Sequence, residues 1–409
     1  MSNSPLPDGT RLLHIGPHKT GTTALQIALA KHSSDILAQG VRYLSEGPRV
    51  NANYAAFALE GRTSRKVEDS LPISLAHWES LKRNAARAQE RIVVMSGEEF
   101  CVLSKENIAK VVEGFGRERI RILVTLRPLG SILGSQWQQY VQAGKMLKSF
   151  EEWLHEVLDS EETPTALGVS FWLRHRHDKL ISRWAEAVGS DKISVIILDD
   201  QHHDALPRSF EELVGVRSGT LSLEERTVNR SLTAQETEAI RSFYQLMDLQ
   251  GYTGIPDHIR YMMSPAEYLK RNRRPLPEEH KILLPSWAAG RAHNISEEMV
   301  GNIKTLNVQI IGSIENLLST PSHQTELAGS DKSLVPIDLA GWTTLGALVH
   351  SRVIEGELPL PKRLSPNQIR RATGGQLVRE LVRRTRLRLL GAVEKKSLQV
   401  ETEPQWDDE

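Results

Sequence analysis

Short apolar runs recur along the first two hundred residues, separated by segments in which apolar residues repeat every three or four positions. Runs of four to eight residues that are rich in Val, Ile and Leu predict β-strands. The predicted strands are Arg11–Ile15, Val41–Leu44, Arg91–Ser96, Arg119–Leu126 and Lys192–Leu198. Because most of these runs are apolar at nearly every position, they favour a sheet that is covered on both faces.

Helical periodicity fills the intervals between these strands. The predicted helices are Thr22–His32, Ile73–Gln89, Lys105–Phe115, Ser131–Ala143, Phe150–Asp159 and Trp172–Val188. Strands that alternate with helices predict an α/β fold with a doubly wound parallel sheet of the P-loop NTPase type. Ligands of such sheets bind at the carboxyl ends of the strands. The polar segment Ser45–Pro72 has no clean period and reads as a flap over such a site.

The trailing third of the chain is organised differently. Residues 221–318 are helix-rich, with amphipathic periods over Thr233–Gln250 and Glu297–Leu317. A stretch rich in Ser, Thr and Gly follows, as is typical of linkers. We therefore predict an α/β domain at 1–318, a linker at 319–336 and a basic helical extension at 337–409.

The overall charge is balanced, with 51 Lys and Arg residues against 51 Asp and Glu residues, so the composition makes nucleic acid an unexpected partner. The strongest local asymmetry lies at 362–396, where leucines at helical spacing have arginines around them. A basic amphipathic helix of this kind binds an anionic membrane, an acidic partner or a nucleic acid, or docks on its own domain by its leucines. The acidic end, 401–409, predicts disorder.

The single cysteine, Cys101, excludes an intrachain disulfide and fits a reducing compartment. Its apolar neighbours, Phe100–Leu103, predict a small core residue rather than a nucleophile. Residues 1–11 lack an apolar signal region, and no run approaches the roughly 20 apolar residues of a membrane helix. We expect a cytoplasmic protein whose basic helix allows peripheral contact with a membrane.

The turn after the first predicted strand carries Gly16 and Gly21, five positions apart. A strand, a glycine loop and a helix in this order direct backbone N–H groups and a positive helix end toward an anion. A Walker A loop requires lysine directly after its second glycine. This chain has Thr22 there, and its lysine, Lys19, lies inside the loop. The loop is therefore a candidate anion site, but not one built to bind the terminal phosphate of a nucleoside triphosphate.

This loop resembles the 5′-phosphosulfate loop of the sulfotransferase family, K-[ST]-G-T-[TS]. The matching residues are Lys19, Thr20, Gly21, Thr22 and Thr23. That family takes a sulfo group from 3′-phosphoadenylyl sulfate (PAPS), so the resemblance implies PAPS as the donor and these residues as its 5′ site. It also implies that Lys19 stabilises the negative charge on the leaving oxygen.

A second motif follows the strand at 119–126. Arg127 comes directly after it, and Ser135 lies eight residues further on. This pair is similar to the 3′-phosphate site of the sulfotransferases, in which an arginine offers a fork of donors and a serine on the next helix adds a hydroxyl. The family commonly has Arg-Asn-Pro where this chain has Arg127-Pro128. Asn229–Leu232 also resembles a segment of bacterial members.

Sulfo transfer to a hydroxyl requires a base. Glu98 and Glu99 follow the third predicted strand, and we prefer Glu98 because it is nearer the strand end. His18, beside Lys19, is a further candidate. The resemblance leaves the choice open, since family members use either a glutamate or a histidine.

No metal is expected, because the proposed chemistry requires none. His202, His203 and Asp204 form a superficial cluster, but adjacent histidines on a polar loop rarely converge on one ion. His14 alternates with Ile15 along the first strand, which predicts a hydrogen-bonded core histidine.

The sequence thus predicts a PAPS-dependent sulfotransferase that acts on a hydroxyl-bearing acceptor of unknown class. The first alternative is a P-loop nucleotide kinase or NTPase. It is disfavoured because Thr22 stands where a Walker A loop requires lysine. It is also disfavoured because no apolar strand is followed by a convincing magnesium-binding aspartate, and Asp199–Asp200 is the nearest match. The second alternative is a non-catalytic protein that binds a nucleotide or a partner.

Overall fold

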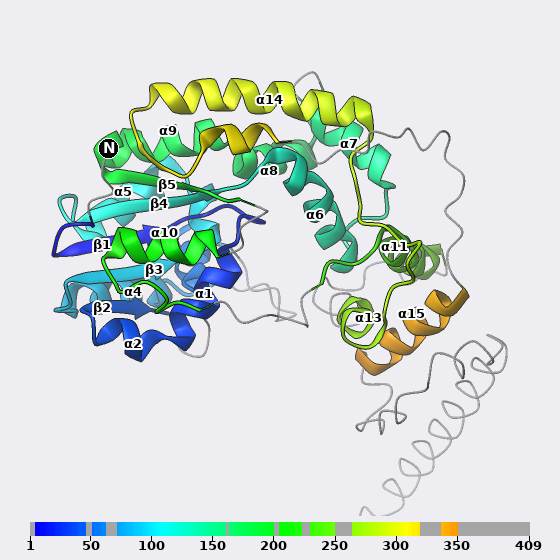
Figure 1. Cartoon of the computed structure of the whole chain (residues 1–409), viewed down its shortest axis with the longest axis horizontal. Coiled ribbons are helices and arrows are strands. Elements are labelled where there is room, and N and C mark those ends of the chain that lie inside the picture. Colours follow the sequence, from blue (N-terminus) through cyan, green and yellow to red (C-terminus); the bar gives the residue numbers. More distant parts are fainter. Residues whose placement is uncertain are drawn as a thin grey trace, which may run out of the picture. The chain divides into compact units, whose positions relative to one another are not determined.

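The computed structural model describes residues 5–45, 51–62, 72–160, 163–199, 204–222, 230–249, 264–319 and 337–350 (Figure 1). The chain divides into two compact units. The first comprises Met1–Gln139, Lys148–Thr227 and Ile282–Ala328, and the second comprises Tyr140–Leu147, Val228–Lys281 and Gly329–Glu409. The domain boundaries predicted at residues 318 and 336 stay predictions.

The first unit contains a parallel sheet, which confirms the predicted α/β class. In the described residues it has six strands, in the order β2-β3-β1-β4-β5-β6, and every pair is parallel. The strands are β1 (Thr10–His14), β2 (Val41–Leu44), β3 (Ile92–Ser96), β4 (Ile120–Leu126), β5 (Ile193–Ile197) and β6 (Gln309–Ile311). All residues of β1, β3 and β5 are buried, as expected for strands covered on both faces.

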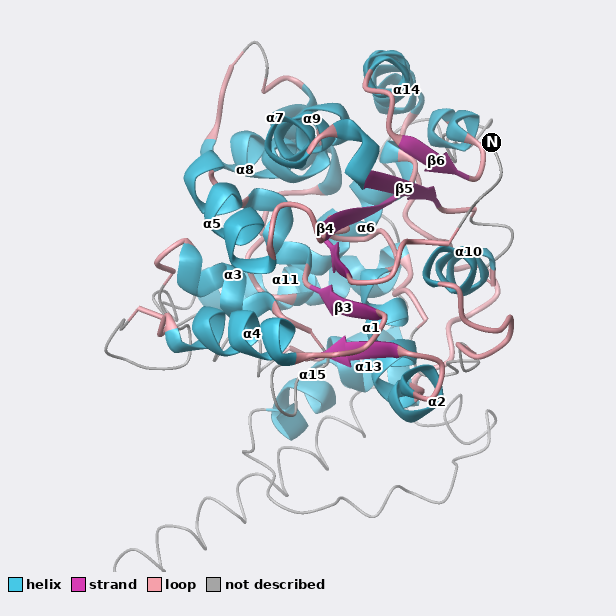
Figure 2. Cartoon of the chain, turned by 90° about the vertical axis from the view of Figure 1, so that its left-hand side faces the viewer, coloured by secondary structure: helices cyan, strands magenta, loops and turns pink. Residues whose placement is uncertain are grey.

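Two helix layers enclose the sheet (Figure 2). One layer contains α4 (Ala76–Arg87), α5 (Lys105–Phe115) and α9 (His177–Val188), and the other contains α1 (Thr22–Lys31), α2 (Ser33–Leu37) and α10 (Ala205–Val214). Successive strand residues face opposite layers: Leu13 belongs to the first core and Leu12 to the second. By the same alternation, Thr125 faces the α1 side while Val124 faces the α5 side.

The first unit contains further helices and turns. They are α3 (Asn53–Leu59), η1 (Glu98–Val102), α6 (Leu129–Gln142, which continues into the second unit), α7 (Phe150–Leu158), α8 (Ala166–His175), η2 (Ser190–Lys192), α14 (Ser286–Thr305) and η3 (Ile314–Leu318). The helix predicted over Trp172–Val188 is two helices. Arg176 separates them with a non-helical ψ of 83°, and its guanidinium is buried between Asp178 and Glu298.

The helix predicted over Glu297–Leu317 also differs from the structure. It starts earlier, as α14, and ends at Thr305. Asn307 then takes a left-handed φ of 51°, which stops the helix and leads into β6.

The second unit is helical. It contains α11 (Ala234–Leu249), α13 (Ala266–Asn272) and α15 (Ile337–His350), and α15 packs on the other two. Arg273 is 1 % exposed and pairs with Glu236, Glu279 and Asp338. Arg273, in the basic run 270–274, is therefore part of the interior. The predicted segments 320–336 and 362–409, and His202, His203 and Asn229, lie outside the described residues.

Candidate functional site

The loop between β1 and α1 has a tightly constrained backbone. A Cβ on Gly16 would lie 2.2 Å from Thr125 Oγ1 and 2.7 Å from His14 Nε2, so only glycine fits there. Lys19 and Gly21 both have left-handed backbones, with φ of 70° and 77°. A left-handed lysine is an unusual, costly conformation that clusters at functional sites. Gly21 is also the N-cap of α1, so no N-cap side chain covers the first-turn N–H groups.

Hydrogen bonds tie this loop to the neighbouring strands. Thr20 Oγ1 donates to the Pro17 carbonyl at 2.7 Å and lies 3.0 Å from Thr125 Oγ1 on β4. His14 bridges the same Thr125 hydroxyl, at 3.0 Å, to the Ser96 hydroxyl on β3, at 2.9 Å. The carboxyl ends of β3, β1 and β4 are thus joined below the loop.

His14 is the hydrogen-bonded core histidine that the sequence predicts. Its side chain is fully buried, and burial lowers its pKa to about 3. A neutral ring can accept at one nitrogen and donate at the other, which is what its two hydroxyl neighbours require.

The threonines of the motif have different environments. Thr22 Oγ1 donates to the Gly16 carbonyl at 3.3 Å and closes the loop from inside. Thr20 and Thr22 are buried, Lys19 is half-buried, and Thr23 is exposed. The loop thus uses two of its hydroxyls to hold its own shape and leaves the first-turn N–H groups of α1 without a side-chain cap.

Arg127 follows the last residue of β4 and is two positions from Thr125. β1 and β4 are adjacent and parallel, with His14 opposite Leu123, so the Lys19 loop and Arg127 leave neighbouring strand ends. Ser135 lies on α6, about 9 Å along the helix axis from its first residue. Arg127 and Ser135 are both half-buried. The topology thus places the two predicted anion motifs at one edge of the sheet.

Glu99 occupies η1, directly after β3, and is buried. His18 Nε2 lies 3.2 Å from Glu99 Oε1, and Arg62 Nη1 donates to Glu99 Oε2 at 2.9 Å. Burial alone would raise the pKa of Glu99. The hydrogen bond to His18 and the charges of His18, Arg62 and Arg174 outweigh that effect and lower the pKa to about 2.

Glu98 has a different neighbour. It is half-buried and accepts a hydrogen bond from Gln26 Nε2 on α1 at 3.2 Å, and the same amide donates to Ser96 Oγ at 3.1 Å. The structure therefore brings His18 and Glu99 together, and it places Glu98 with α1.

Three site residues could not be found from the sequence. Gln26, Asn53 and Arg62 carry no motif, and their roles come from distant segments meeting in space. Asn53 begins α3, inside the region predicted as a flap. The described part of that region instead packs in the core, with Ala52 and Ala55 fully buried.

Other predicted residues lie outside this cluster. Cys101 is buried, as predicted, and burial raises its pKa to about 12. Asp199 follows β5 and its neighbour Asp200 lies outside the described part. Among the residues that the structure describes, no group of three His, Cys, Asp or Glu side chains is placed to hold a metal ion. None of the described helices is long and apolar enough to span a bilayer.

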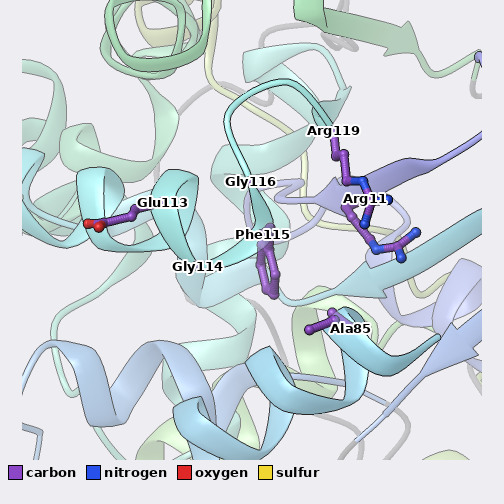
Figure 3. A pocket seen from close by; sticks show the side chains of 8 residues that line it. Arg11, Ala85, Glu113, Gly114, Phe115, Gly116 and Arg119 are labelled. Carbon is purple, nitrogen blue, oxygen red and sulfur yellow. The ribbon is translucent and has the colours of Figure 1, made fainter.

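A hollow of about 230 Å³ lies at the opposite, amino edge of the sheet (Figure 3). It is lined by Arg11, Phe115 and Arg119 among others, and the Arg11 and Arg119 side chains lie near each other. It shares no lining residue with the loop after β1, so it is a separate feature from the candidate site.

Comparison with known proteins adds little to this geometry. No protein-family model matches the sequence, and no curated protein matches it. Among solved structures, the chain is similar to the crystal structure of a sulfotransferase from Alicyclobacillus acidocaldarius, with 15% identity and a TM-score of 0.38. The match covers 65% of this chain and 97% of that one. A likeness this weak carries no functional weight, so we base the function on the residues of the site.

Proposed function

We propose that the protein is a sulfotransferase that moves a sulfo group from PAPS to an acceptor hydroxyl. The observation that carries this proposal is the 3.0 Å contact between Thr20 Oγ1 in the loop and Thr125 Oγ1 on β4. It fixes the loop against β4, the strand that Arg127 directly follows. Two anion-binding motifs at adjacent strand ends suit a nucleotide with phosphate at both its 5′ and 3′ positions.

Each motif has a part in this reaction. Backbone N–H groups at the start of α1 hold the 5′-phosphate, aided by the positive end of the helix dipole. The Arg127 fork and the Ser135 hydroxyl bind the 3′-phosphate. Because the 3′-phosphate is the same in substrate and product, Arg127 and Ser135 contribute binding and orientation.

Lys19 has the catalytic role. As the acceptor oxygen bonds to sulfur, the bond between sulfur and the bridging 5′-phosphate oxygen breaks, and that oxygen takes the electron pair. A cation fixed beside this oxygen stabilises the transition state more than the ground state. The left-handed backbone at Lys19, φ 70°, is consistent with a lysine held for this purpose.

The test is a calorimetric titration with adenosine 3′,5′-bisphosphate, the product nucleotide, in buffer without magnesium. We expect saturable binding with one site. The same titration with ATP, with and without magnesium, tests the nucleotide-kinase alternative. Tight ATP binding that depends on magnesium, together with no binding of the bisphosphate, would overturn the sulfotransferase proposal.

A further inference from the structure

His18, Glu99 and Arg62 form a chain of hydrogen bonds at the carboxyl edge of the sheet. The two links measure 3.2 Å and 2.9 Å, and each uses a different oxygen of the Glu99 carboxylate. The backbone N–H of Glu99 also donates to Asn53 Oδ1 at 3.2 Å. The carboxylate is thus held by the loop after β1 and by the segment after α3, and the start of α3 holds the backbone of Glu99.

We propose that His18 is the base that takes the proton from the acceptor hydroxyl, and that Glu99 is the positioning residue that orients its ring. This inference rests on the proposed sulfo transfer and assigns the base among the candidates. A carboxylate can only accept, so Glu99 selects the neutral tautomer with hydrogen on Nε2. The lone pair then lies on Nδ1, the nitrogen that faces away from Glu99.

Exposure separates His18 from Glu99. The His18 side chain is 21% exposed and the Glu99 side chain 10%, so the ring is the more accessible group. Both Glu99 oxygens are engaged, and Glu98 accepts a hydrogen bond from Gln26. Within the described residues, His18 Nδ1 receives no hydrogen bond from the protein. His18 also precedes Lys19, which places base and cation on one loop.

The His18 ring faces one carboxylate, Glu99, and has cationic neighbours as well. Lys19 is its chain neighbour, and Arg174 and His175 lie on α8, close enough to interact with the His18–Glu99 pair. His175 is fully buried, and burial together with the charges of His177, His18 and Arg174 keeps its pKa well below the usual value. His175 therefore stays neutral, and the Glu99 carboxylate balances the imidazolium that forms on His18.

The transfer forms one bond to sulfur and breaks another. The acceptor oxygen forms a bond to sulfur while its proton moves to Nδ1 of His18. The bond from sulfur to the bridging phosphate oxygen breaks, and adenosine 3′,5′-bisphosphate leaves with that electron pair. The proton on His18 then passes to water.

The test measures release of labelled sulfate from PAPS into water, which serves as the acceptor, under single-turnover conditions. We expect His18→Ala to slow release by about 100-fold or more, and added imidazole to restore part of the rate. The calorimetric affinity for adenosine 3′,5′-bisphosphate should not change. The matched control is His155→Ala, since His155 also pairs with a carboxylate, Asp159, at 3.1 Å, but on α7. It should leave rate and affinity unchanged.

Glu99→Gln tests the positioning role separately. Its amide can donate to the ring, so heteronuclear NMR of the histidines should show that His18 loses its preference for hydrogen on Nε2. The release rate should fall, and imidazole should not restore it.

The outcomes of these experiments separate a failure of the proposed function from a failure of the base assignment. If the unmodified protein neither binds the bisphosphate nor releases sulfate, the proposed function and this inference both fail. If it does both and His18→Ala keeps the full rate, only the inference fails. A collapse of the rate in Glu98→Gln, with His18→Ala unaffected, assigns the base to Glu98 instead.

Discussion

Gly16 has the shortest contact for an added Cβ among the glycines that the structure describes. An alanine there would place its Cβ 2.2 Å from Thr125 Oγ1, 2.7 Å from His14 Nε2 and 3.0 Å from Thr22 Oγ1. Real Cβ contacts are longer, so these side chains must move. Thr125 cannot move freely, because its hydroxyl bonds to both His14 and Thr20 at 3.0 Å.

The loss of stability expected for Gly16→Ala follows from these contacts. Losing the two Thr125 hydrogen bonds costs about 1 kcal/mol each. Forcing a methyl group into a packed site costs about 2 kcal/mol more. The smaller entropy of an unfolded alanine offsets less than about 1 kcal/mol of this. We therefore expect Gly16→Ala to lower the free energy of unfolding by about 3 kcal/mol, which corresponds to a fall in Tm of about 5 °C for a unit of this size.

The assay is thermal unfolding followed by circular dichroism, and the matched control is Gly301→Ala. Gly301 lies in α14 and is exposed, and a Cβ added there would meet no neighbouring side chain within 4 Å. Because alanine is the better helix former, this control should gain about 0.5–1 kcal/mol. A Gly16→Ala protein as stable as the unmodified one would refute the packing described for the loop.

Three further predictions concern buried ionisable groups. The pKa of His14 is lowered to about 3 by burial, so its contribution to stability is complete above about pH 6.5 and falls as the pH drops toward 3; His14→Asn should flatten that part of a plot of urea midpoint against pH. For Glu99, the neighbouring cations outweigh burial and lower the pKa to about 2. Its contribution to stability is therefore complete above about pH 4.5 and declines toward pH 2. Glu99→Gln should remove this decline and lower the stability at neutral pH. Arg273→Met leaves buried carboxylates without their cation and should cost the second unit about 3–5 kcal/mol, whereas the exposed Arg271→Met should change it by less than about 0.5 kcal/mol. Equal midpoints for the two arginine variants would contradict the interior role of Arg273.

The sheet was predictable because its central strands are nearly continuous apolar runs. Ile120–Leu126 and Ile193–Ile197 lie within their predicted ranges, since burial on both faces leaves a signal that needs no tertiary information. β6 carried no such signal. It has three residues, lies at the edge, and is only partly buried, so its assignment depends on pairing with β5 rather than on its own sequence.

The candidate site was likewise predictable only in part. The Lys19 loop and Arg127 are local motifs, and topology alone places them at neighbouring strand ends. The partners of Glu99 could not be predicted, because Arg62 is 37 residues away in sequence and His18 is 81. A single sequence shows that a carboxylate follows a strand, but it does not show which distant cations it meets.

The pairing of the Lys19 loop with Arg127 around one nucleotide is open to a direct measurement. Calorimetry without magnesium should compare adenosine 3′,5′-bisphosphate with adenosine 5′-phosphate, in the unmodified protein and in Arg127→Ala. The matched control is Arg121→Ala, on the same strand, where the guanidinium donates to the Glu118 and Ile120 carbonyls.

We expect the unmodified protein and the Arg121→Ala control to prefer the bisphosphate by about 10- to 100-fold, the value of a charged hydrogen-bond pair of about 1.5–3 kcal/mol. Arg127→Ala should abolish this preference and keep its affinity for the 5′-phosphate. Retention of the full preference in Arg127→Ala, or an equal loss of both nucleotides, would contradict a single nucleotide held between the two motifs.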